Sequence, residues 1–195
     1  MENKKCRIAI FASGEGSNAE AIVSHFANHN AIEVALMVCN KEKAGVYTRM
    51  EKWGIPCHYI DKKEWQPGST GQQVLDLMRN EGVDRIVLAG FLAYIPETIV
   101  HTYEGRIVNI HPSLLPKYGG KGMWGHHVHE AVIANREAVS GITIHHVTEK
   151  LDDGGIIFQA QCQVLPDDTP ESLATRIHQL EHEHYPRIIE QLGMR

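Results

Sequence analysis

The stretch RIAIFASGEGSNAEAIVSHFA, residues 7–27, decides the fold class of this chain. It begins with a short apolar run at residues 7–12, which is typical of a buried β-strand, and a glycine-rich turn follows. Apolar residues then recur at helical spacing over residues 19–27, where Ile22, Val23 and Phe26 share one face. A buried strand, a glycine turn and an amphipathic helix in this order predict the first unit of an α/β sheet.

The same alternation continues along the chain. Further strands are predicted at residues 33–39, 56–60, 84–89, 106–110, 141–147 and 156–164, and further helices at residues 44–53, 71–80 and from residue 168 onward. Strands that alternate with helices form βαβ units, so we expect an α/β fold with a doubly wound, mainly parallel (mixed) sheet and a less regular C-terminal part. Pro186 lies inside the last helical pattern and is expected to kink or break it.

The composition is that of a globular domain. The chain has 195 residues, of which 43% are hydrophobic and 22% charged, enough for one domain with a sizeable core. A formal net charge of -5 disfavours nucleic-acid binding, because neutralising phosphates takes a surplus of Lys and Arg. We expect no signal peptide and no membrane span, since no apolar run approaches the roughly twenty residues that a bilayer requires. The scattered cysteines are expected to be reduced thiols in a cytoplasmic protein.

The turn at residues 13–18 is a candidate anion site. Glycines let a backbone approach a phosphate closely, and free N–H groups at a helix start favour negative charge. Three interpretations compete: a capped turn without ligand, a dinucleotide fingerprint over residues 14–19, and a monophosphate site. The dinucleotide is disfavoured because the second strand ends at Cys39-Asn40, without the acidic residue that binds ribose hydroxyls. The monophosphate site fits best, with the Glu15 side chain pointing away from the ligand.

A second candidate site lies at the end of the strand predicted at residues 106–110. Asn109 and His111 alternate in extended chain, so both side chains should project to the same side. An amide can donate to a developing oxyanion and an imidazole can exchange protons near neutral pH, which suits acyl transfer. On this pair alone, two polar residues that merely close a strand are the favoured interpretation.

Several motifs in one order resemble the folate-dependent formyltransferases, in the branch that formylates glycinamide ribonucleotide (GAR). They are SGEGSN at residues 13–18, VLAGF at 87–91, NIHPSLLP at 109–116, LDDGGIIFQ at 151–159 and EHEHYP at 181–186. The resemblance covers nearly the whole chain and implies a Rossmann-like formyltransferase fold in a single domain, residues 1–195. It implies a phosphate-binding half at about residues 1–105 and a catalytic and folate-binding half at about residues 106–195.

The resemblance also implies an activity. The family transfers the formyl group of its co-substrate 10-formyltetrahydrofolate to an amine, here the glycyl amine of GAR in purine biosynthesis, and uses no metal. Its catalytic trio matches Asn109, His111 and Asp152. The amine attacks the formyl carbon directly, Asn109 and protonated His111 stabilise the oxyanion, and Asp152 favours the charged imidazole that moves protons.

The binding residues are implied position by position. For GAR the matching positions are Gly16, Ser17, Asn18, His178, Gln179, Leu180 and Glu181. For the folate they are Leu92, Ala93, Tyr94, Ile95, Asn109, Thr148, Glu149, Lys150, Leu151 and Asp152. His145 is expected to support the site. The implied partners are small-molecule substrates, with no nucleic acid and no membrane, and the implied assembly is a monomer or homodimer.

The chain departs from the family pattern in three places. The glycine-rich segment 119–127 is longer than usual and is expected to form a mobile or enlarged lid beside the site. The arginine that contacts the folate near residues 67–70 in many members is absent. Asp153 stands where the family usually has a small residue, and it adds a second carboxylate beside Asp152.

Two histidine patterns suggest metal sites. His178-x-x-Glu181-His182 fits a zinc-protease pattern, but no third ligand accompanies it. A group of three, His126, His127 and His129, falls on a loop-to-helix junction and is expected to be solvated. No metal is therefore expected.

Three rival functions are open. A relative that formylates an initiator aminoacyl-tRNA shares the trio, but it normally carries an RNA-binding domain and a basic surface that this length and charge do not suit. A relative that hydrolyses formyl-folate carries an N-terminal regulatory domain, whereas the catalytic pattern here begins by residue 7. A non-catalytic nucleotide sensor would need the phosphate turn but not Asn109, His111 and Asp152 together.

Overall fold

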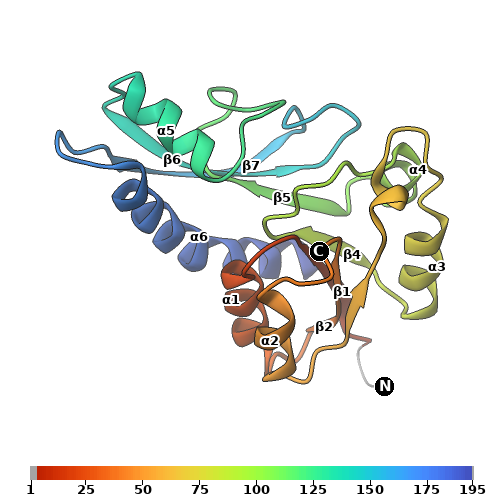
Figure 1. Cartoon of the computed structure of the whole chain (residues 1–195). Coiled ribbons are helices and arrows are strands. Elements are labelled where there is room, and N and C mark those ends of the chain that lie inside the picture. The colour runs from red at the N-terminus through yellow and green to blue at the C-terminus, as the bar shows by residue number, and fades with distance from the viewer. Residues whose placement is uncertain (1–3, 195) are drawn as a thin grey trace.

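The computed structural model describes residues 4–194 and contains one seven-stranded sheet (Figure 1). The strands are β1 (Cys6–Ala12), β2 (Ile32–Cys39), β3 (Cys57–Tyr59), β4 (Arg85–Leu88), β5 (Ile107–His111), β6 (Val139–His146) and β7 (Ile156–Gln163). They lie in the order β3-β2-β1-β4-β5-β6-β7. The strands from β1 to β5 pair in parallel, while β6 and β7 join antiparallel, so the predicted mainly parallel, mixed α/β sheet is confirmed.

Helices cover both faces of the sheet (Figure 1). They are α1 (Ser17–Phe26), α2 (Val46–Glu51), the 3-10 turn η1 (Lys62–Trp65), α3 (Gln72–Asn80), α4 (Glu97–Thr102), α5 (His126–Ala134) and α6 (Pro170–Gly193). One buried core joins the sheet to α1, α2, α5 and α6, and a second joins it to η1, α3 and α4. No helix within residues 4–194 is both long enough and apolar enough to cross a membrane.

The central strand β1 shows why its sequence is continuously apolar. Ile8 and Ile10 belong to the core of α1 and α6, whereas Ala9 and Phe11 belong to the core of α3 and α4. All four side chains are fully buried, because alternate residues of a strand face opposite sides of the sheet. Burying a large aliphatic side chain contributes about 1.5–3 kcal/mol, so β1 anchors both layers.

The winding of the sheet reverses between β1 and β4. The chain first moves outward from β1 through β2 to β3, and then crosses back to place β4 and β5 on the other side of β1. Ligands of open α/β sheets bind beyond the carboxyl ends of the strands at such a switch point. Ser13 connects the segments that follow β1 and β4 at this point. Its N–H donates to the carbonyl oxygen of Gly90, and its hydroxyl accepts from the Leu92 N–H.

The last helix, α6, lacks the break that is one of the two predicted outcomes at Pro186. It continues unbroken through this residue over 24 residues. Proline inside a helix costs about 3 kcal/mol, because it has no N–H for the carbonyl one turn earlier. Pro186 is buried together with Tyr185 and Ile189, and this packing offsets the cost. The Tyr185 hydroxyl also donates to the carbonyl oxygens of Leu88 and Val108, at 2.9 and 3.2 Å, and so pins α6 to β4 and β5.

The region around α5 contains a second difference. The predicted loop-to-helix junction is present, and His126 and His127 are exposed as expected. The prediction that His129 is solvated is wrong, because its side chain lies beside Val128 and Val132 on the buried face of the helix. Burial is the main cause that lowers its pKa to about 4, so His129 is neutral at physiological pH. The short helix α4 was not predicted.

Candidate active site

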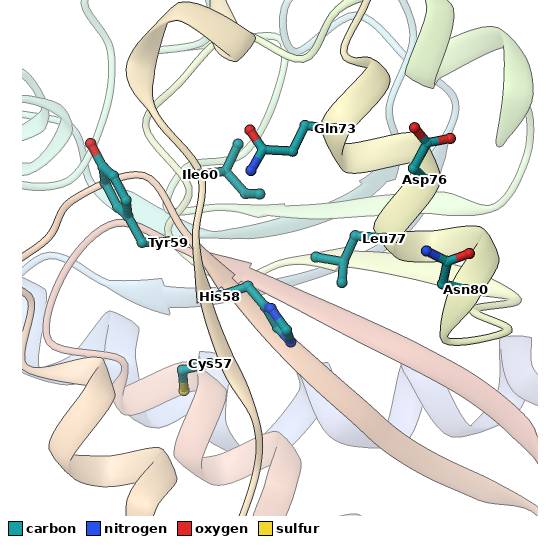
Figure 2. Close-up of a pocket in the computed structure, with 8 residues that line it drawn as sticks. All are labelled: Cys57, His58, Tyr59, Ile60, Gln73, Asp76, Leu77 and Asn80. Atoms are coloured by element: carbon teal, nitrogen blue, oxygen red, sulfur yellow. The ribbon is translucent and has the colours of Figure 1, made fainter.

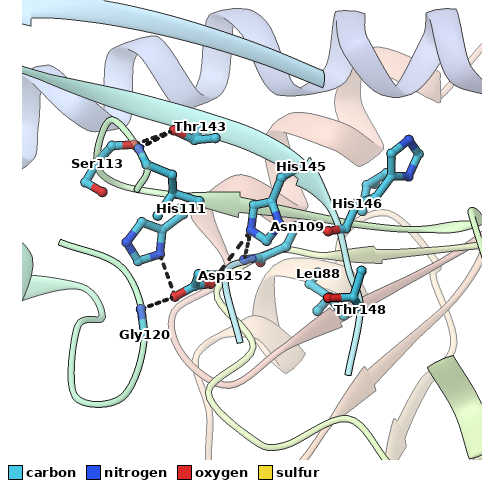
Figure 3. Close-up of polar contacts among 12 residues, drawn as sticks. Leu88, Asn109, His111, Ser113, Gly120, Thr143, His145, His146, Thr148 and Asp152 are labelled. Carbon is cyan, nitrogen blue, oxygen red and sulfur yellow. Dashed lines mark hydrogen bonds and ion pairs between the residues drawn. The ribbon is translucent and has the colours of Figure 1, made fainter. Parts of the chain in front are cut away.

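The end of β5 holds two of the predicted catalytic side chains (Figure 3). Asn109 and His111 alternate along the strand, with the buried Ile110 between them in the apolar core. Asp152 reaches the same place from the loop between β6 and β7. Its carboxylate lies 3.6 Å from Nδ1 of His111 and 3.7 Å from Nε2 of His145. The structure therefore brings the predicted trio and His145 into one cluster.

His145 on β6 orients the amide of Asn109. Its Nδ1 lies 2.9 Å from the carbonyl oxygen of His146, which can only accept, so Nδ1 carries the proton. Its Nε2 then accepts from Nδ2 of Asn109 at 3.1 Å. Burial is the main cause that lowers the pKa of His145, in agreement with a neutral ring. One N–H of the amide is fixed in this way, and the second N–H is the one that can donate to an oxyanion.

The imidazole of His111 has a polar neighbour at each nitrogen. The residue is 4% exposed, and its Nε2 lies 2.7 Å from the carbonyl oxygen of Tyr118. Its Nδ1 faces Asp152 at 3.6 Å, just beyond hydrogen-bonding distance. A carbonyl oxygen and a carboxylate therefore flank the ring, one at each nitrogen.

Asp152, rather than Asp153, faces His111. The Asp152 side chain is 9% exposed and accepts from the Gly120 N–H at 2.9 Å. Its φ of 52° is left-handed, a conformation that Asp tolerates better than most residues. The Asp153 side chain is 54% exposed and pairs with Lys150 at 3.0 Å, so the second carboxylate turns toward solvent.

The glycine turn has the geometry of an anion site. Gly16 has a left-handed φ of 76°, and α1 begins at Ser17 without a side-chain cap for its first N–H groups within the described residues. A Cβ on Gly16 would lie 2.4 Å from Cγ2 of Val46, so the packing of α2 requires glycine as much as φ does. The Glu15 carboxylate packs against Gly45 at the start of α2. The helix start therefore presents backbone donors for a negative group.

Asn18 and Glu181 connect this turn to α6. Nδ2 of Asn18 donates to Oε2 of Glu181 at 2.8 Å. Glu181 is 5% exposed, and burial raises its pKa, while the bond from Asn18 and the nearby His178 act in the opposite direction. Oδ1 of Asn18 is buried without a hydrogen-bond partner among the residues that the structure describes, which leaves an acceptor for a ligand.

The other implied residues of α6 have different surroundings. His178 and Gln179 are exposed, and Leu180 packs against the core of α1 and α6. Glu181 is the one whose side chain bonds to the glycine turn. Glu181, the acid of the zinc-protease pattern, is thus turned toward Asn18. Within residues 4–194, no three His, Cys, Asp or Glu side chains are arranged to hold a metal ion.

The two segments implied in folate binding lie near each other. One segment follows β4 and the other follows β6. Burial and Glu97 raise the pKa of Tyr94 in the first segment, and Glu149 from the second adds to that shift. Leu92 and Leu151 are 48% and 61% exposed, which gives this edge apolar side chains that a flat ring system can cover.

A separate depression lies at the other end of the sheet (Figure 2). It has a volume of about 480 Å³ and is lined by Cys57, His58, Tyr59, Ile60, Gln73, Asp76, Leu77 and Asn80. β2, β1 and β4 separate its strand, β3, from β5. Burial raises the pKa of Cys57 to about 11, so its thiol is protonated and unreactive at neutral pH. None of the predicted site residues lines this depression.

Two groups that contact His111 and Asp152 were not predicted from the sequence, because they belong to the backbone. They are the carbonyl of Tyr118, bonded to His111, and the N–H of Gly120, bonded to Asp152. The signal for them in the sequence is the glycine pair Gly119-Gly120. In the structure, a Cβ on Gly119 would lie 2.5 Å from Leu115 and 3.4 Å from Asp152. The segment 119–127 therefore begins beside the site, as expected, and its mobility stays a prediction.

Comparisons with known proteins identify the family. Residues 6–189 match the model of the formyl transferase family. Phosphoribosylglycinamide formyltransferase of Bacillus subtilis (strain 168) is 39% identical over 188 residues, which cover 95% of this chain and 94% of that protein. The chloroplastic phosphoribosylglycinamide formyltransferase of Arabidopsis thaliana is 38% identical over 191 residues, or 96% of this chain, but the chain spans only 65% of that relative.

A solved structure agrees with the fold. The crystal structure of phosphoribosylglycinamide formyltransferase from Bacillus halodurans superposes with a TM-score of 0.86 at 40% identity. The match covers 95% of this chain and 94% of that one. Fold, family match and whole-length similarity agree, and the chain belongs to the formyl transferase family.

Proposed function

We propose that this chain transfers the formyl group of 10-formyltetrahydrofolate to the glycyl amine of N1-(5-phosphoribosyl)glycinamide, GAR, in de novo purine (IMP) biosynthesis. The observation that carries the proposal is the meeting of Asn109, His111 and Asp152 at the carboxyl edge of the sheet that also bears the glycine turn. An oxyanion donor, a proton-exchanging ring and an anion site on one edge are the parts that this reaction needs.

The reaction follows from these groups. The amine nitrogen of GAR attacks the formyl carbon, and the electron pair of the C=O bond moves to oxygen, forming a tetrahedral oxyanion. The second amide N–H of Asn109 and protonated His111 donate to that oxygen. The attacking nitrogen loses a proton. The oxyanion then re-forms the C=O bond, the bond between the formyl carbon and the folate nitrogen breaks, and that nitrogen gains a proton. His111 moves the proton while Asp152 stabilises its charge. The chain forms no covalent intermediate.

The substrates take complementary places in the proposal. The phosphate of GAR binds the start of α1 at Gly16, Ser17 and Asn18, and the segment 178–181 binds another part of GAR, with Glu181 as its best-supported member. The folate lies against residues 92–95, Asn109 and residues 148–152. The proposal assigns phosphate binding to a half at about residues 1–105, and catalysis with folate binding to a half at about residues 106–195. Each half also lends one segment to the other substrate: residues 92–95 to the folate, and residues 178–181 to GAR.

The same proposal covers the setting of the enzyme. It acts in the cytoplasm as a monomer or homodimer, on small molecules, without a metal, a nucleic acid or a membrane partner. The net charge of -5 supports the absence of nucleic acid, since phosphate neutralisation takes excess positive charge.

The test is a spectrophotometric assay with purified protein, GAR and a 10-formyl folate analogue, which follows release of the deformylated folate. We expect release that depends on GAR and disappears in His111→Ala. A matched control is His25→Ala, because His25 lies in the last turn of α1 and its ring pairs with Glu190 of α6. Release without GAR would identify a hydrolase instead, and GAR binding without any release would identify a sensor; either result contradicts the proposal.

A further inference from the structure

The backbone of Tyr118, Gly119 and Gly120 brackets the catalytic pair. The carbonyl oxygen of Tyr118 lies 2.7 Å from Nε2 of His111, and the N–H of Gly120 donates to Oδ2 of Asp152 at 2.9 Å (Figure 3 shows the second bond). Gly119 between them packs onto Leu115 with no room for a side chain. A three-residue segment therefore holds both the ring and the acid of the cluster.

This contact decides which nitrogen of His111 exchanges protons. A carbonyl oxygen can only accept, so Nε2 carries a proton in the neutral ring as well as in the charged one. The proton that comes and goes is then on Nδ1, which faces Asp152 at 3.6 Å. If the Tyr118 carbonyl moved away, the neutral ring could place its proton on either nitrogen, and part of the population would present the wrong one.

Tyr118 occupies a conformation that needs support. Its φ of 57° lies in the left-handed region, where a bulky side chain is disfavoured. The phenol hydroxyl donates to Oε1 of Glu137 at 2.9 Å, and Nζ of Lys117 lies 3.0 and 3.2 Å from the same carboxylate. The Ser113 hydroxyl donates to the carbonyl of Lys117 at 2.6 Å, which fixes the preceding peptide. The segment is thus tied to Glu137, which lies two residues before β6.

The protonation states of Tyr118 and Glu137 suit the hydrogen bond between their side chains. Bonds from Lys117 and Tyr118 lower the pKa of Glu137, so its carboxylate is charged at neutral pH. Burial, followed by the bond to Glu137, raises the pKa of Tyr118, so its phenol keeps the proton that it donates. A neutral hydroxyl that donates to a carboxylate makes a stronger hydrogen bond than a neutral pair does.

We propose that Tyr118 and Glu137 are positioning residues: their side-chain bond holds the left-handed Tyr118 backbone so that its carbonyl selects the Nε2–H form of His111. Neither side chain touches the substrates in this scheme. The consequence for turnover rests on the proposed function, whereas the state of the His111 ring does not.

The ring is measured first, in the free protein without substrate. Long-range ¹H–¹⁵N NMR spectra report which nitrogen of neutral His111 carries the proton. We expect Nε2–H in the wild type and a mixture of both forms in Tyr118→Phe, which keeps the aromatic packing but loses the hydroxyl. Glu137→Ala should give the same mixture, while Glu137→Gln, whose amide oxygen still accepts from the phenol, should restore most of the Nε2–H form.

Turnover is measured second. We expect kcat to fall about tenfold in Tyr118→Phe and in Glu137→Ala at nearly constant KM, because a misplaced proton donor affects the transition state and not substrate binding. The double variant should be no slower than either single variant, since both remove one bond. The matched control is Tyr103→Phe, which loses a buried hydroxyl bond to the Val83 carbonyl at 3.1 Å away from the cluster.

The outcomes separate the two proposals. If neutral His111 keeps the wild-type Nε2–H form in both Tyr118→Phe and Glu137→Ala, the positioning role is overturned. A loss of kcat in Tyr103→Phe equal to that in Tyr118→Phe also overturns it. A wild-type protein without GAR-dependent turnover overturns the proposed function, and the NMR result then still decides the positioning role on its own.

Discussion

The glycine turn and the proposed catalytic cluster lie on one edge of the sheet and are built in opposite ways. The turn is a single contiguous stretch, in which the donors are backbone N–H groups and one glycine sets the geometry. The cluster gathers side chains from β5, β6 and the loop after β6, and backbone groups from the segment after β5. The geometry of the turn depends on the backbone conformation of one glycine. The geometry of the cluster depends on the packing and hydrogen bonds of all the elements that carry its groups.

The support of the cluster extends into the core. Thr143 on β6 donates to the carbonyl of Ser113 at 2.7 Å and accepts from the Leu115 N–H at 3.0 Å (the Ser113 contact is drawn in Figure 3). Gln159 on β7 adds a bond to the same hydroxyl at 2.8 Å. These buried bonds fix the chain as it leaves β5, so the position of His111 relies on two further strands.

Removing the ring from the cluster should have the largest effect. We expect His111→Ala to lower kcat/KM by about a thousandfold or more, because general acid–base catalysis contributes roughly 10²–10⁴. The variant should fold, which circular dichroism and thermal unfolding can check, and steady-state kinetics give the loss. A variant with more than a tenth of wild-type kcat/KM would mean that the cluster is not the reacting centre.

Substituting Gly16 in the turn should lower activity less than His111→Ala does, and should lower the free energy of unfolding more. Gly16→Ala places a Cβ 2.4 Å from Val46 in a left-handed conformation, and we expect about 2–3 kcal/mol lower free energy of unfolding from strain and overpacking. The KM for GAR should rise roughly tenfold, because the first N–H groups of α1 shift. Urea unfolding and kinetics measure both effects.

Gly14→Ala is the matched control for this change. A Cβ at Gly14 meets nothing within 4 Å, so both quantities should stay near the wild-type values. Equal effects of the two substitutions would contradict the assignment of the turn geometry to Gly16.

The contact between the turn and α6 gives a smaller, pH-dependent effect. Burial raises the pKa of Glu181 above its ordinary 4.5, so the native state binds this proton more tightly than the unfolded state. The stability from this group is full below that ordinary value and is lost as pH rises through the folded pKa. Glu181→Gln does not titrate, so as pH rises above 4.5 through the folded pKa its free energy of unfolding should fall less than that of the wild type.

Denaturant unfolding at several pH values tests this expectation, and kinetics test the site. We expect a severalfold higher KM for GAR in Glu181→Gln, because the amide cannot offer the charge of a carboxylate. Parallel stability curves for the two proteins would show that Glu181 titrates normally and would refute the argument from burial.

An ion pair away from both sites should affect activity least. Arg176 binds Asp168 through two bonds of 2.8 and 3.0 Å at the start of α6. The bond from Arg176 is the main cause that lowers the pKa of Asp168 below its ordinary 3.8, so this stability is present above that value and is lost as pH falls through the folded pKa. We expect Asp168→Asn to lower the free energy of unfolding at pH 7 by about 1–2 kcal/mol without changing kcat/KM. A tenfold loss of turnover would show that this helix start is coupled to the sites.

The fold and the turn could be predicted because their determinants are local. A continuously apolar β1, a glycine turn and an amphipathic α1 each follow from the period and type of neighbouring residues. Asn109 and His111 were paired by strand alternation, and Asp152 was added by resemblance to a family. The predicted break at Pro186 is absent from α6, and the burial of His129 was not predicted. In both places packing against the sheet outweighs the preference of the residue.

The sequence by itself therefore determined the α/β class, the glycine turn and the residue types of the cluster, since periodicity and φ requirements act over a few residues. Only the tertiary structure decided which atoms face each other: Asn109 toward His145, Asp152 toward His111, and the Tyr118 carbonyl toward Nε2. The physical reason is that a hydrogen bond forms over about 3 Å between groups that the chain separates, and backbone carbonyls are present at every residue. Which of these carbonyls bonds to a given side chain depends on sheet order, loop conformation and burial together.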